Sequence, residues 1–284
     1  MLGLFQQEAV AIYDLSNFVA RAAAIAGEKH IGLFCDMLRK QRVRMPLHRF
    51  VFAVEGKGTE RRREICAYYK ANRTSTTEFN IARQNAIKVL RYVECEVVRA
   101  PNGEADDAIA SYIHRKCPEA AVVVVSNDRD LWQLINQNVK VRCKIKRTVL
   151  SVDKHVCLRE LGVAPLKVPL LKSLIGDPSD GIPRSVPSIK EALLVRLANE
   201  ADNASDIPAT VEKADWLKDK EKEKILENMN TILRHERITT LDTSSDLDIL
   251  LHKANRSRFM KTVEHFDVKG MSKDDMDIII GVKL

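Results

Sequence analysis

The feature that most constrains the fold is an apolar run followed within several residues by an acidic residue, because it recurs along the first half of the chain. The runs are "VAIYD" at 10–14, "FVFAV" at 50–54 and "VVVV" at 122–125, with a fourth, shorter one at 96–98. Segments of helix-forming composition lie between them. Continuous apolar strands that alternate with helices are typical of a parallel sheet covered on both faces. We therefore expect an α/β fold with a mostly parallel central sheet covered by helices.

The acidic residues that follow these strands are expected at one edge of the sheet. In open parallel sheets the functional crevice lies outside the carboxyl ends of the strands. A single acid at such a position is commonly a helix cap or a turn residue. Several carboxylates a few ångströms apart repel one another unless cations intervene. The residues concerned are Asp14, Glu55, Glu104, Asp106, Asp107, Asp128 and Asp130.

This set of acids favours a particular kind of cation. Carboxylates without nearby His or Cys suit hard, oxygen-preferring ions such as Mg²⁺ or Mn²⁺. A further acidic element, "GDPSDGIP", places Asp177 and Asp180 in a Gly/Pro-rich turn after the apolar segment "VPLLKSLIG". Two acids in a turn are usually turn chemistry, but these two could also complete a second metal position.

The charge of the chain favours a polyanionic partner. The 284 residues carry a formal net charge of +7, with a pI of about 9.0. Between residues 39 and 91, fourteen basic residues occur with only four acidic ones. A solvated helix face can explain such a run, but phosphate contact becomes the better interpretation when catalytic groups lie beside it.

Composition excludes several other classes of protein. No apolar run approaches the roughly 20 residues that a membrane-spanning helix needs, and the start of the chain does not have the pattern of a secretory signal. We expect a soluble, cytoplasmic protein with no membrane partner. The six cysteines have no CxxC or Cys/His spacing, so free, mostly buried thiols are expected.

The motifs together resemble a known family. The blocks "IYDLSNFVARA", "FAVEGKGTERRREICAYYKANR", "GEADDAIAS", "VVSNDRDLWQLI" and "GDPSDGIP" occur in this order over roughly residues 10–200. They resemble the structure-specific 5′-nucleases, which include bacteriophage-type flap endonucleases and 5′→3′ exonucleases and the nuclease domain at the front of bacterial DNA polymerase I. The part of the chain beyond residue 200 resembles the family only loosely.

The resemblance implies a metal site and a substrate. Asp14, Glu55, Glu104, Asp106, Asp128, Asp130 and Asp177 match the acids that hold two or more divalent ions in the family, with Asp107 and Asp180 as supporting acids. The implied activity is hydrolysis of phosphodiester bonds near the 5′ ends of branched or duplex DNA, as a flap endonuclease or a 5′→3′ exonuclease in replication or repair. A monomer is expected.

The resemblance also assigns the basic residues. In "YYKANR", Lys70 and Arg73 match the catalytic pair that reaches the scissile phosphate, and Tyr69 matches a residue that can stack on a nucleobase. Arg62 matches another DNA-binding position. Residues 59–92 would form a helical arch that admits a single-stranded 5′ end.

Residues 166–198 resemble a helix-three-turn-helix that grips duplex backbone, with Lys190 as a phosphate contact and a potassium ion in the turn at 176–189. Two departures bear on these assignments. Glu55 stands where the family usually has Asp, and "VPSIKEA" lacks the glycines of the family's turn. Missing glycines restrict positive φ angles, which puts potassium binding in doubt.

We expect two domains, an α/β nuclease core with the arch at 1–165 and a helical C-terminal region at 166–284. Two other interpretations stay open. One is a catalytically weak nucleic-acid-binding protein on the same fold, and the other is a PIN-type ribonuclease. The sequence does not fix the balance of exonuclease and endonuclease activity, the preferred flap length, or the order of the arch without DNA.

Overall fold

The computed structural model describes residues 9–72, 76–146 and 148–282, and the chain forms two compact units. Unit 1 consists of Met1–Gly56, Thr74–Asn127 and Thr243–Leu284, and unit 2 consists of Lys57–Arg73 and Asp128–Asp242. Neither unit is one continuous stretch of chain. The expected division at residue 165 stays a prediction.

Unit 1 is built on a mostly parallel sheet, as the alternation of strands and helices predicted. Its strand order is β4-β1-β2-β3-β7, in which only β7 runs antiparallel to its neighbour. The strands are β1 (Ala9–Asp14), β2 (Arg49–Val54), β3 (Cys95–Arg99), β4 (Ala121–Val125) and β7 (Asp248–His252). The helices are α1 (Leu15–Ala26), α2 (His30–Arg44), α4 (Thr77–Leu90), α5 (Ala105–Lys116), α12 (Arg256–His265) and α13 (Lys273–Ile280), with a 3₁₀ turn, η1, at Gly27–Lys29.

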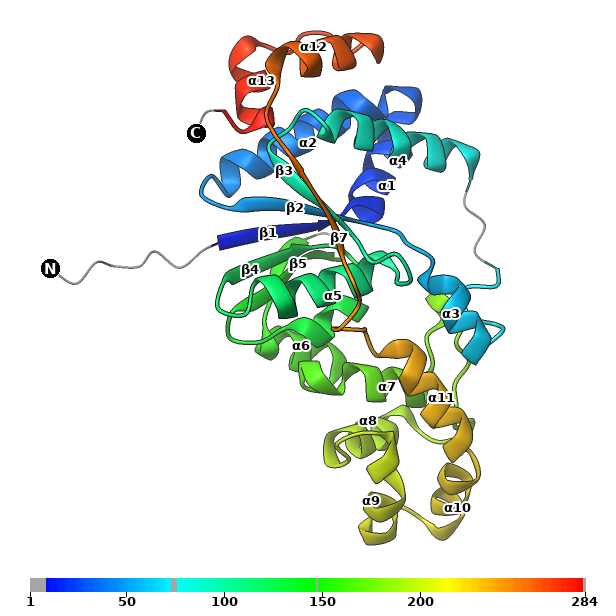
Figure 1. Cartoon of the computed structure of the whole chain (residues 1–284). Helices are drawn as coiled ribbons and strands as arrows, with labels where there is room; N and C mark the ends of the chain where they lie inside the picture. The colour runs from blue at the N-terminus through cyan, green and yellow to red at the C-terminus, as the bar shows by residue number, and fades with distance from the viewer. Residues whose placement is uncertain (1–8, 73–75, 147, 283–284) are drawn as a thin grey trace, which may run out of the picture. The chain divides into compact units, whose positions relative to one another are not determined.

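The central strands of unit 1 are buried on both faces, which explains their continuous apolar sequences. β1 and β2 are each buried over their four inner residues. On one face Tyr13 packs against Phe50 and Phe52, with ring centroids 5.2 and 5.0 Å apart. Helices α1, α2, α4, α12 and α13 contribute to the core on this face, and α5 packs against β1, β2 and β3 from the other (Figure 1).

The start of α1 is capped by the last residue of β1. The N-cap is Asp14, whose Oδ1 accepts a hydrogen bond from the backbone N–H of Asn17 at 3.0 Å. Strand β1 ends at the residue that caps α1, so no loop separates them. A carboxylate at this position also interacts favourably with the helix dipole.

Unit 2 is mostly helical. Its helices are α3 (Gly58–Ile65), α6 (Lys154–Leu161), α7 (Val168–Ile175), α8 (Glu191–Glu200), α9 (Ile207–Lys213), α10 (Asp219–Glu227) and α11 (Met229–Thr239). Strands β5 (Val139–Ile145) and β6 (Thr148–Val152) form an antiparallel pair. The 3₁₀ turns are η2 (Asp130–Leu134), η3 (Pro165–Lys167), η4 (Pro178–Asp180) and η5 (Ala204–Asp206).

Two segments anticipated from the sequence are visible in part. Helices α7 and α8 flank a turn, in agreement with a helix-turn-helix arrangement at 166–198. Of the expected arch, α3 belongs to unit 2 and α4 to unit 1, and residues 73–75 lie outside the described residues. The geometry of the arch is therefore still a prediction.

The cysteines and the hydropathy pattern agree with the sequence analysis. All six cysteines are buried and free. Within residues 9–72, 76–146 and 148–282, no helix has the length and apolar character to cross a membrane.

Candidate metal-binding and phosphate-contacting residues

The acids of unit 1 lie at the carboxyl edge of its sheet. The register pairs Asp14 with Ala53 on β2, and Val54 with Arg99 on β3. Glu55 therefore follows β2 at the same edge at which β3 leads through residues 100–103 into α5. This arrangement confirms that the strands deliver Asp14, Glu55 and the start of α5 to one edge.

Glu55 contacts the start of α5 directly. Its Oε2 accepts a hydrogen bond from the backbone N–H of Ala105 at 3.0 Å. The neighbouring Gly56 makes this approach feasible, because a Cβ there would lie 1.9 Å from the carbonyl oxygen of Ala100 and 2.6 Å from that of Gly103. Only glycine allows the segment after β2 to pack so closely on the 100–103 loop.

The three acids of "GEADDAIAS" differ in burial and in their hydrogen bonds. Asp107 is buried, and its Oδ2 accepts a hydrogen bond from the backbone N–H of Glu104 at 2.9 Å, as in a capping box. Asp106 is half-buried, and its Oδ1 accepts from the N–H of Asp107 at 2.8 Å. The side chain of Glu104 is buried at the first turn of the helix. The partial positive charge of a helix N-terminus interacts favourably with carboxylates placed in its first turn.

Asp14 has polar neighbours that the sequence analysis did not single out. The hydroxyl of Ser126 donates to Asp14 Oδ2 at 3.2 Å. Asn17 accepts from both the backbone and side-chain nitrogens of Asn127, at 3.1 and 3.2 Å. The signal for these residues was available, since Ser126 and Asn127 directly follow β4 and Asn17 lies in the first turn of α1.

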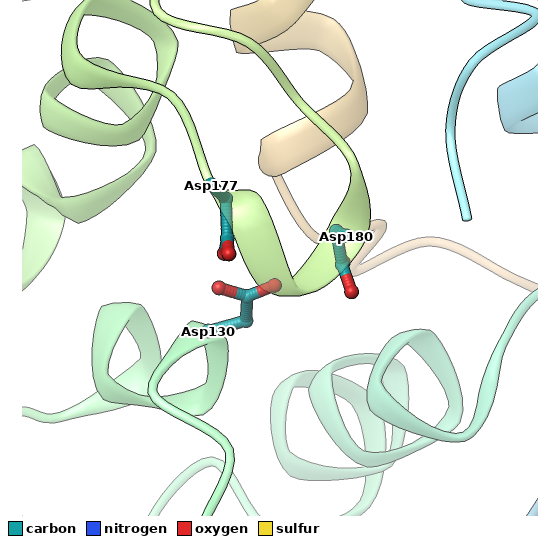
Figure 2. A group of neighbouring side chains, drawn as sticks. All are labelled: Asp130, Asp177 and Asp180. Atoms are coloured by element: carbon teal, nitrogen blue, oxygen red, sulfur yellow. The ribbon is translucent and has the colours of Figure 1, made fainter. Parts of the chain in front are cut away.

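Unit 2 contains a compact acidic group formed by Asp130, Asp177 and Asp180. One carboxylate oxygen from each lies within 4.8 Å of the others. Figure 2 shows the carboxylate of Asp177 facing that of Asp130, with Asp180 on the same turn as Asp177. Asp128 precedes the group, and its Oδ1 accepts from the backbone N–H of Asp130 at 2.9 Å. Asp128 therefore lies next to the group formed by the other three acids of unit 2.

Lys172 pairs with two members of this group, and sequence reasoning missed it. Its Nζ lies 2.6 Å from Asp177 Oδ2 and also forms an ion pair with Asp130. The side chain of Lys172 is only 16% exposed. Lys172 is the one charged residue of α7, "VPLLKSLI", and a charge on such an apolar helix next to an acidic turn was the available signal.

The environment of Asp177 favours its charged form. Burial alone would raise the pKa of this carboxyl, but the positive charge of Lys172 and hydrogen bonds from Lys172 and Ser179 lower the pKa below its usual value. Ser179 donates its backbone N–H at 2.9 Å and its hydroxyl at 2.6 Å to Asp177 Oδ1. Asp177 is therefore ionised and fixed in orientation, as a metal ligand must be.

Lys70 lies beside the acidic turn of unit 2. Its backbone N–H donates to the carbonyl oxygen of Asp180 at 2.7 Å, and its Nζ lies 3.7 Å from Asp180 Oδ2. Its φ angle of 49° lies in the left-handed region, which costs a non-glycine residue about 1 kcal/mol. The side chain of Arg63 stabilises this turn, donating to the carbonyl oxygens of Tyr69 at 3.0 Å and Lys70 at 2.7 Å.

A buried histidine links the same segment to α11. The hydroxyl of Tyr68 bonds to His235 Nε2, and Ser185 Oγ lies 2.6 Å from His235 Nδ1. Because the Ser185 hydroxyl donates to the carbonyl oxygen of Ser173 at 2.5 Å, His235 must donate from Nδ1 and accept at Nε2. Burial lowers the pKa of His235, which favours this neutral form.

The structure corrects the role expected for Tyr69. Its side chain is 2% exposed and packs with Cys66, Ile182 and Ile238. A base needs an open ring face for stacking, so Tyr69 serves as the core of this segment instead. Arg62 is also buried, with its guanidinium 5.8 Å from the centre of the Tyr69 ring.

The remaining predicted contacts have mixed outcomes. Arg73 lies outside the described residues. Lys190 is exposed at the N-cap of α8, where phosphate contact stays a prediction.

The turn before α8 differs from the glycine-rich turn of the family. Ser188 adopts a φ of 68° in place of a glycine. Arg184 donates to the carbonyl oxygens of Val186 at 3.2 Å and Ile189 at 2.5 Å, so an internal cation already binds carbonyls of the turn in which potassium was considered.

Comparison with known proteins identifies the class to which these features belong. The model of the 5′-3′ exonuclease N-terminal resolvase-like domain matches residues 17–162, just over half of the chain. The chain belongs to this family of nucleases.

Two relatives illustrate the extent of the match. The 5′-3′ exonuclease of Buchnera aphidicola subsp. Baizongia pistaciae is 24% identical over 246 residues, which are 84% of this chain and 78% of that protein. DNA polymerase I of Rhizobium leguminosarum is 28% identical over 214 residues, which are 72% of this chain. The match spans only 20% of the polymerase.

Solved structures share the fold over nearly the whole chain. The T5 D15 protein, co-crystallised with metal ions, has a TM-score of 0.69 at 15% identity and covers 96% of this chain and 97% of its own. The catalytic core of Rad2 in complex with a DNA substrate has a TM-score of 0.62 at 14% identity, with coverages of 98% and 92%. The predicted α/β nuclease fold is therefore confirmed.

Proposed function

We propose that this chain is a divalent-metal-dependent 5′-nuclease that hydrolyses phosphodiester bonds near the 5′ ends of branched or duplex DNA. The observation that carries the proposal is the buried group of Asp130, Asp177 and Asp180, whose carboxylate oxygens lie within 4.8 Å of one another. Like charges at this spacing repel strongly, so the group is suited to a cation. The family membership supplies the reaction class.

The donor set fits hard divalent ions. All candidate ligands are carboxylates, which suit Mg²⁺ or Mn²⁺. Asp128, Asp130, Asp177 and Asp180 would hold metal in unit 2, and Asp14, Glu55, Glu104 and Asp106 would do so in unit 1, with Asp107 as a supporting residue. We propose that both sets serve the same reaction with two or more ions. Metal ions in such sites activate water and neutralise charge on the transferred phosphate.

The chain's own residues have distinct parts in this reaction. Lys70, whose Nζ lies 3.7 Å from Asp180 Oδ2, would bind the scissile phosphate and offset the negative charge that develops on it. Ser179 orients Asp177 through two hydrogen bonds. Arg73 would act with Lys70, and the exposed Lys190 would contact the DNA backbone. The buried Arg62 would add long-range positive charge.

The names of the structural neighbours support DNA as the substrate and metal as the cofactor. One T5 5′-exonuclease structure contains bound zinc, and a T5 D15 flap endonuclease variant was solved with DNA and metal ions. The basic segment at 39–91 would supply sequence-independent affinity for phosphate. The physiological role that we propose is replication or repair.

The proposal is tested with a labelled 5′-flap duplex in Mg²⁺ and in EDTA. The wild-type chain should release the flap strand only with metal, and Asp128→Asn should lose most of that activity. Asp215→Asn, an exposed acid in the same unit, should behave like wild type. Absence of cleavage by the wild type, or equal cleavage by Asp128→Asn, would overturn the proposal.

One observation favours a second candidate, a nucleic-acid-binding protein with weak catalysis. Lys172 already neutralises Asp130 and Asp177, and a cation bound there competes with metal. This candidate predicts flap-DNA binding without turnover even in millimolar Mn²⁺. A parallel assay with RNA of the same sequence separates the ribonuclease alternative, which predicts faster cleavage of RNA than of DNA.

A further inference from the structure

Unit 1 contains a basic pocket that takes no part in the acidic edge. Residues of α4 and its C-cap, together with residues of α12, line a pocket of about 510 Å³. This volume is in the range of sites that bind small-molecule-sized groups. The lining includes Lys88, Arg91, Arg258 and Lys261. α4 and α12 lie on the same side of the sheet in Figure 1.

The spacing of these residues puts each pair on the side of its helix that borders the pocket. Lys88 and Arg91 are three apart, and Arg258 and Lys261 are also three apart, so each pair lies on one face of its helix. The other face of α12 packs into the core of unit 1 through Phe259 and Val263. The cations therefore converge on the pocket while the apolar side chains point into the core.

The four cations lack acidic partners. Within the described ranges, no carboxylate lies within 4.0 Å of the charged nitrogens of Lys88, Arg91, Arg258 or Lys261. The same helix pairs its other arginine, since Arg256 forms an ion pair with the buried Asp277. Arg256 is thus paired. The four cations around the pocket are available to bind an anionic ligand, and they repel one another in its absence.

Aromatic rings complete the pocket. Tyr92 and Phe266 line it, are half-buried and pack against the core of unit 1. Each ring is therefore held in place while part of it borders the pocket. Proteins that bind single-stranded nucleic acid combine a basic groove with aromatic rings on which bases stack.

The pocket lies near the amino ends of the strands of unit 1, at the opposite edge of the sheet from the acids of that unit. Tyr92 precedes β3 by three residues, whereas Glu104 follows the end of β3. The five residues of β3 span about 16 Å at 3.3 Å per residue. A group bound in the pocket is therefore separate from any phosphate held at the carboxyl edge.

We propose that this pocket is a second nucleic-acid site, which binds a single-stranded segment through its phosphates and one stacked base. The choice of DNA as ligand rests on the proposed nuclease function, whereas the pocket and its unpaired cations do not. The site would hold a strand of the substrate away from the scissile bond, and so add affinity without contacting the reacting atoms.

The first test measures binding of a fluorescent dT12 oligonucleotide by anisotropy in EDTA, so that cleavage plays no part. Arg91→Gln combined with Lys261→Gln should weaken binding about tenfold and reduce the slope of log K against log salt by about 1.4. The control combines Lys29→Gln and Lys116→Gln, two exposed lysines of unit 1 outside the pocket. Equal losses in both double variants would overturn the proposal.

The second test locates the bound strand. An oligonucleotide carrying 5-iododeoxyuridine should crosslink on irradiation to the peptide that contains Tyr92 or Phe266, and unlabelled dT12 should suppress this at micromolar concentration. Crosslinks confined to other peptides would overturn the proposal. So would suppression by inorganic phosphate or by an acidic peptide at the same concentration, which would indicate a phosphate site or a protein partner. These outcomes do not depend on flap cleavage, so they differ from failure of the proposed function.

Discussion

In unit 1 the acidic side chains accept hydrogen bonds from backbone amides, whereas in unit 2 two of them pair with the side chain of Lys172. Glu55 accepts from Ala105, and Asp107 accepts from Glu104. In unit 2, Asp130 and Asp177 bind the Lys172 ammonium group. The backbone can orient carboxylates and leave their charge in place, while a lysine also neutralises it. The two groups should therefore respond differently to metal and to mutation.

Removal of the lysine should have the largest effect on stability. Lys172→Met leaves Asp130 and Asp177 crowded without a cation, which should cost about 3 to 5 kcal/mol in the absence of metal. Millimolar Mn²⁺ should then raise the Tm of the variant more than that of wild type, because the ion replaces the lost charge. Thermal unfolding with and without Mn²⁺ measures both effects.

The matched control for this experiment is Lys167→Met. Lys167 pairs with Asp202 at 2.9 Å, but that carboxylate is 90% exposed, and such pairs contribute about 1 kcal/mol or less. If the two lysine variants lose equal stability, or if Mn²⁺ raises both Tm values equally, Lys172 does not act as the counter-ion of the acidic group.

The backbone arrangement of unit 1 is tested at Gly56. Gly56→Ala places a methyl group against the carbonyl oxygens of Ala100 and Gly103, which should cost about 1 to 3 kcal/mol and move Glu55 away from α5. Gly32→Ala is the control. Gly32 lies inside α2, and a Cβ there would be 3.8 Å from the nearest atom, which belongs to Val268. Denaturant unfolding should show a loss for the first and no loss for the second. An unchanged Gly56→Ala protein would contradict the close packing.

The smallest effect is expected at His235, which fixes the segment that carries Lys70. Burial lowers the pKa of this imidazole, so the unfolded chain takes up its proton at a higher pH than the folded chain. The stability that neutral His235 contributes is present above the ordinary pKa of about 6.5 and is lost as pH falls toward the depressed pKa. His235→Gln should therefore lower the Tm more at pH 7.5 than at pH 5.

His155, which is exposed, provides the comparison for this pH series. His155→Gln should leave the Tm within about a degree of wild type at both pH values. A Tm difference for His235→Gln that grows as pH falls would show that the folded protein holds the imidazole in its charged form, contrary to the hydrogen bonds with Tyr68 and Ser185.

The sequence predicted the parts of the fold that depend on burial and chain order. Strands β1, β2 and β4 were predictable because a strand buried on both faces needs an unbroken apolar run. The acids at the edge followed from the parallel order of the strands. The cap of α1 is harder to identify from the sequence, because Asp14 both ends a strand and caps a helix.

Other features depend on contacts between distant residues, which periodicity does not reveal. The pairing of Lys172 with Asp130 joins residues 42 positions apart, so the apolar sequence around that lysine indicates its burial but not its partner. The burial of Tyr69 depends on Ile182 and Ile238, so its motif position alone suggested an open ring. The basic pocket likewise combines α4 with α12, which lie far apart in the chain.

The joint role of the two acidic groups is tested most directly by single-turnover cleavage of a 5′-flap duplex in Mg²⁺. Glu104→Gln in unit 1 and Asp130→Asn in unit 2 should each slow cleavage at least about 100-fold, with the flap duplex still bound. The exposed acids Asp246 and Asp215 provide one Asp→Asn control for each unit and should leave the rate unchanged. Full activity in either the Glu104 or the Asp130 variant would contradict a reaction that requires both groups.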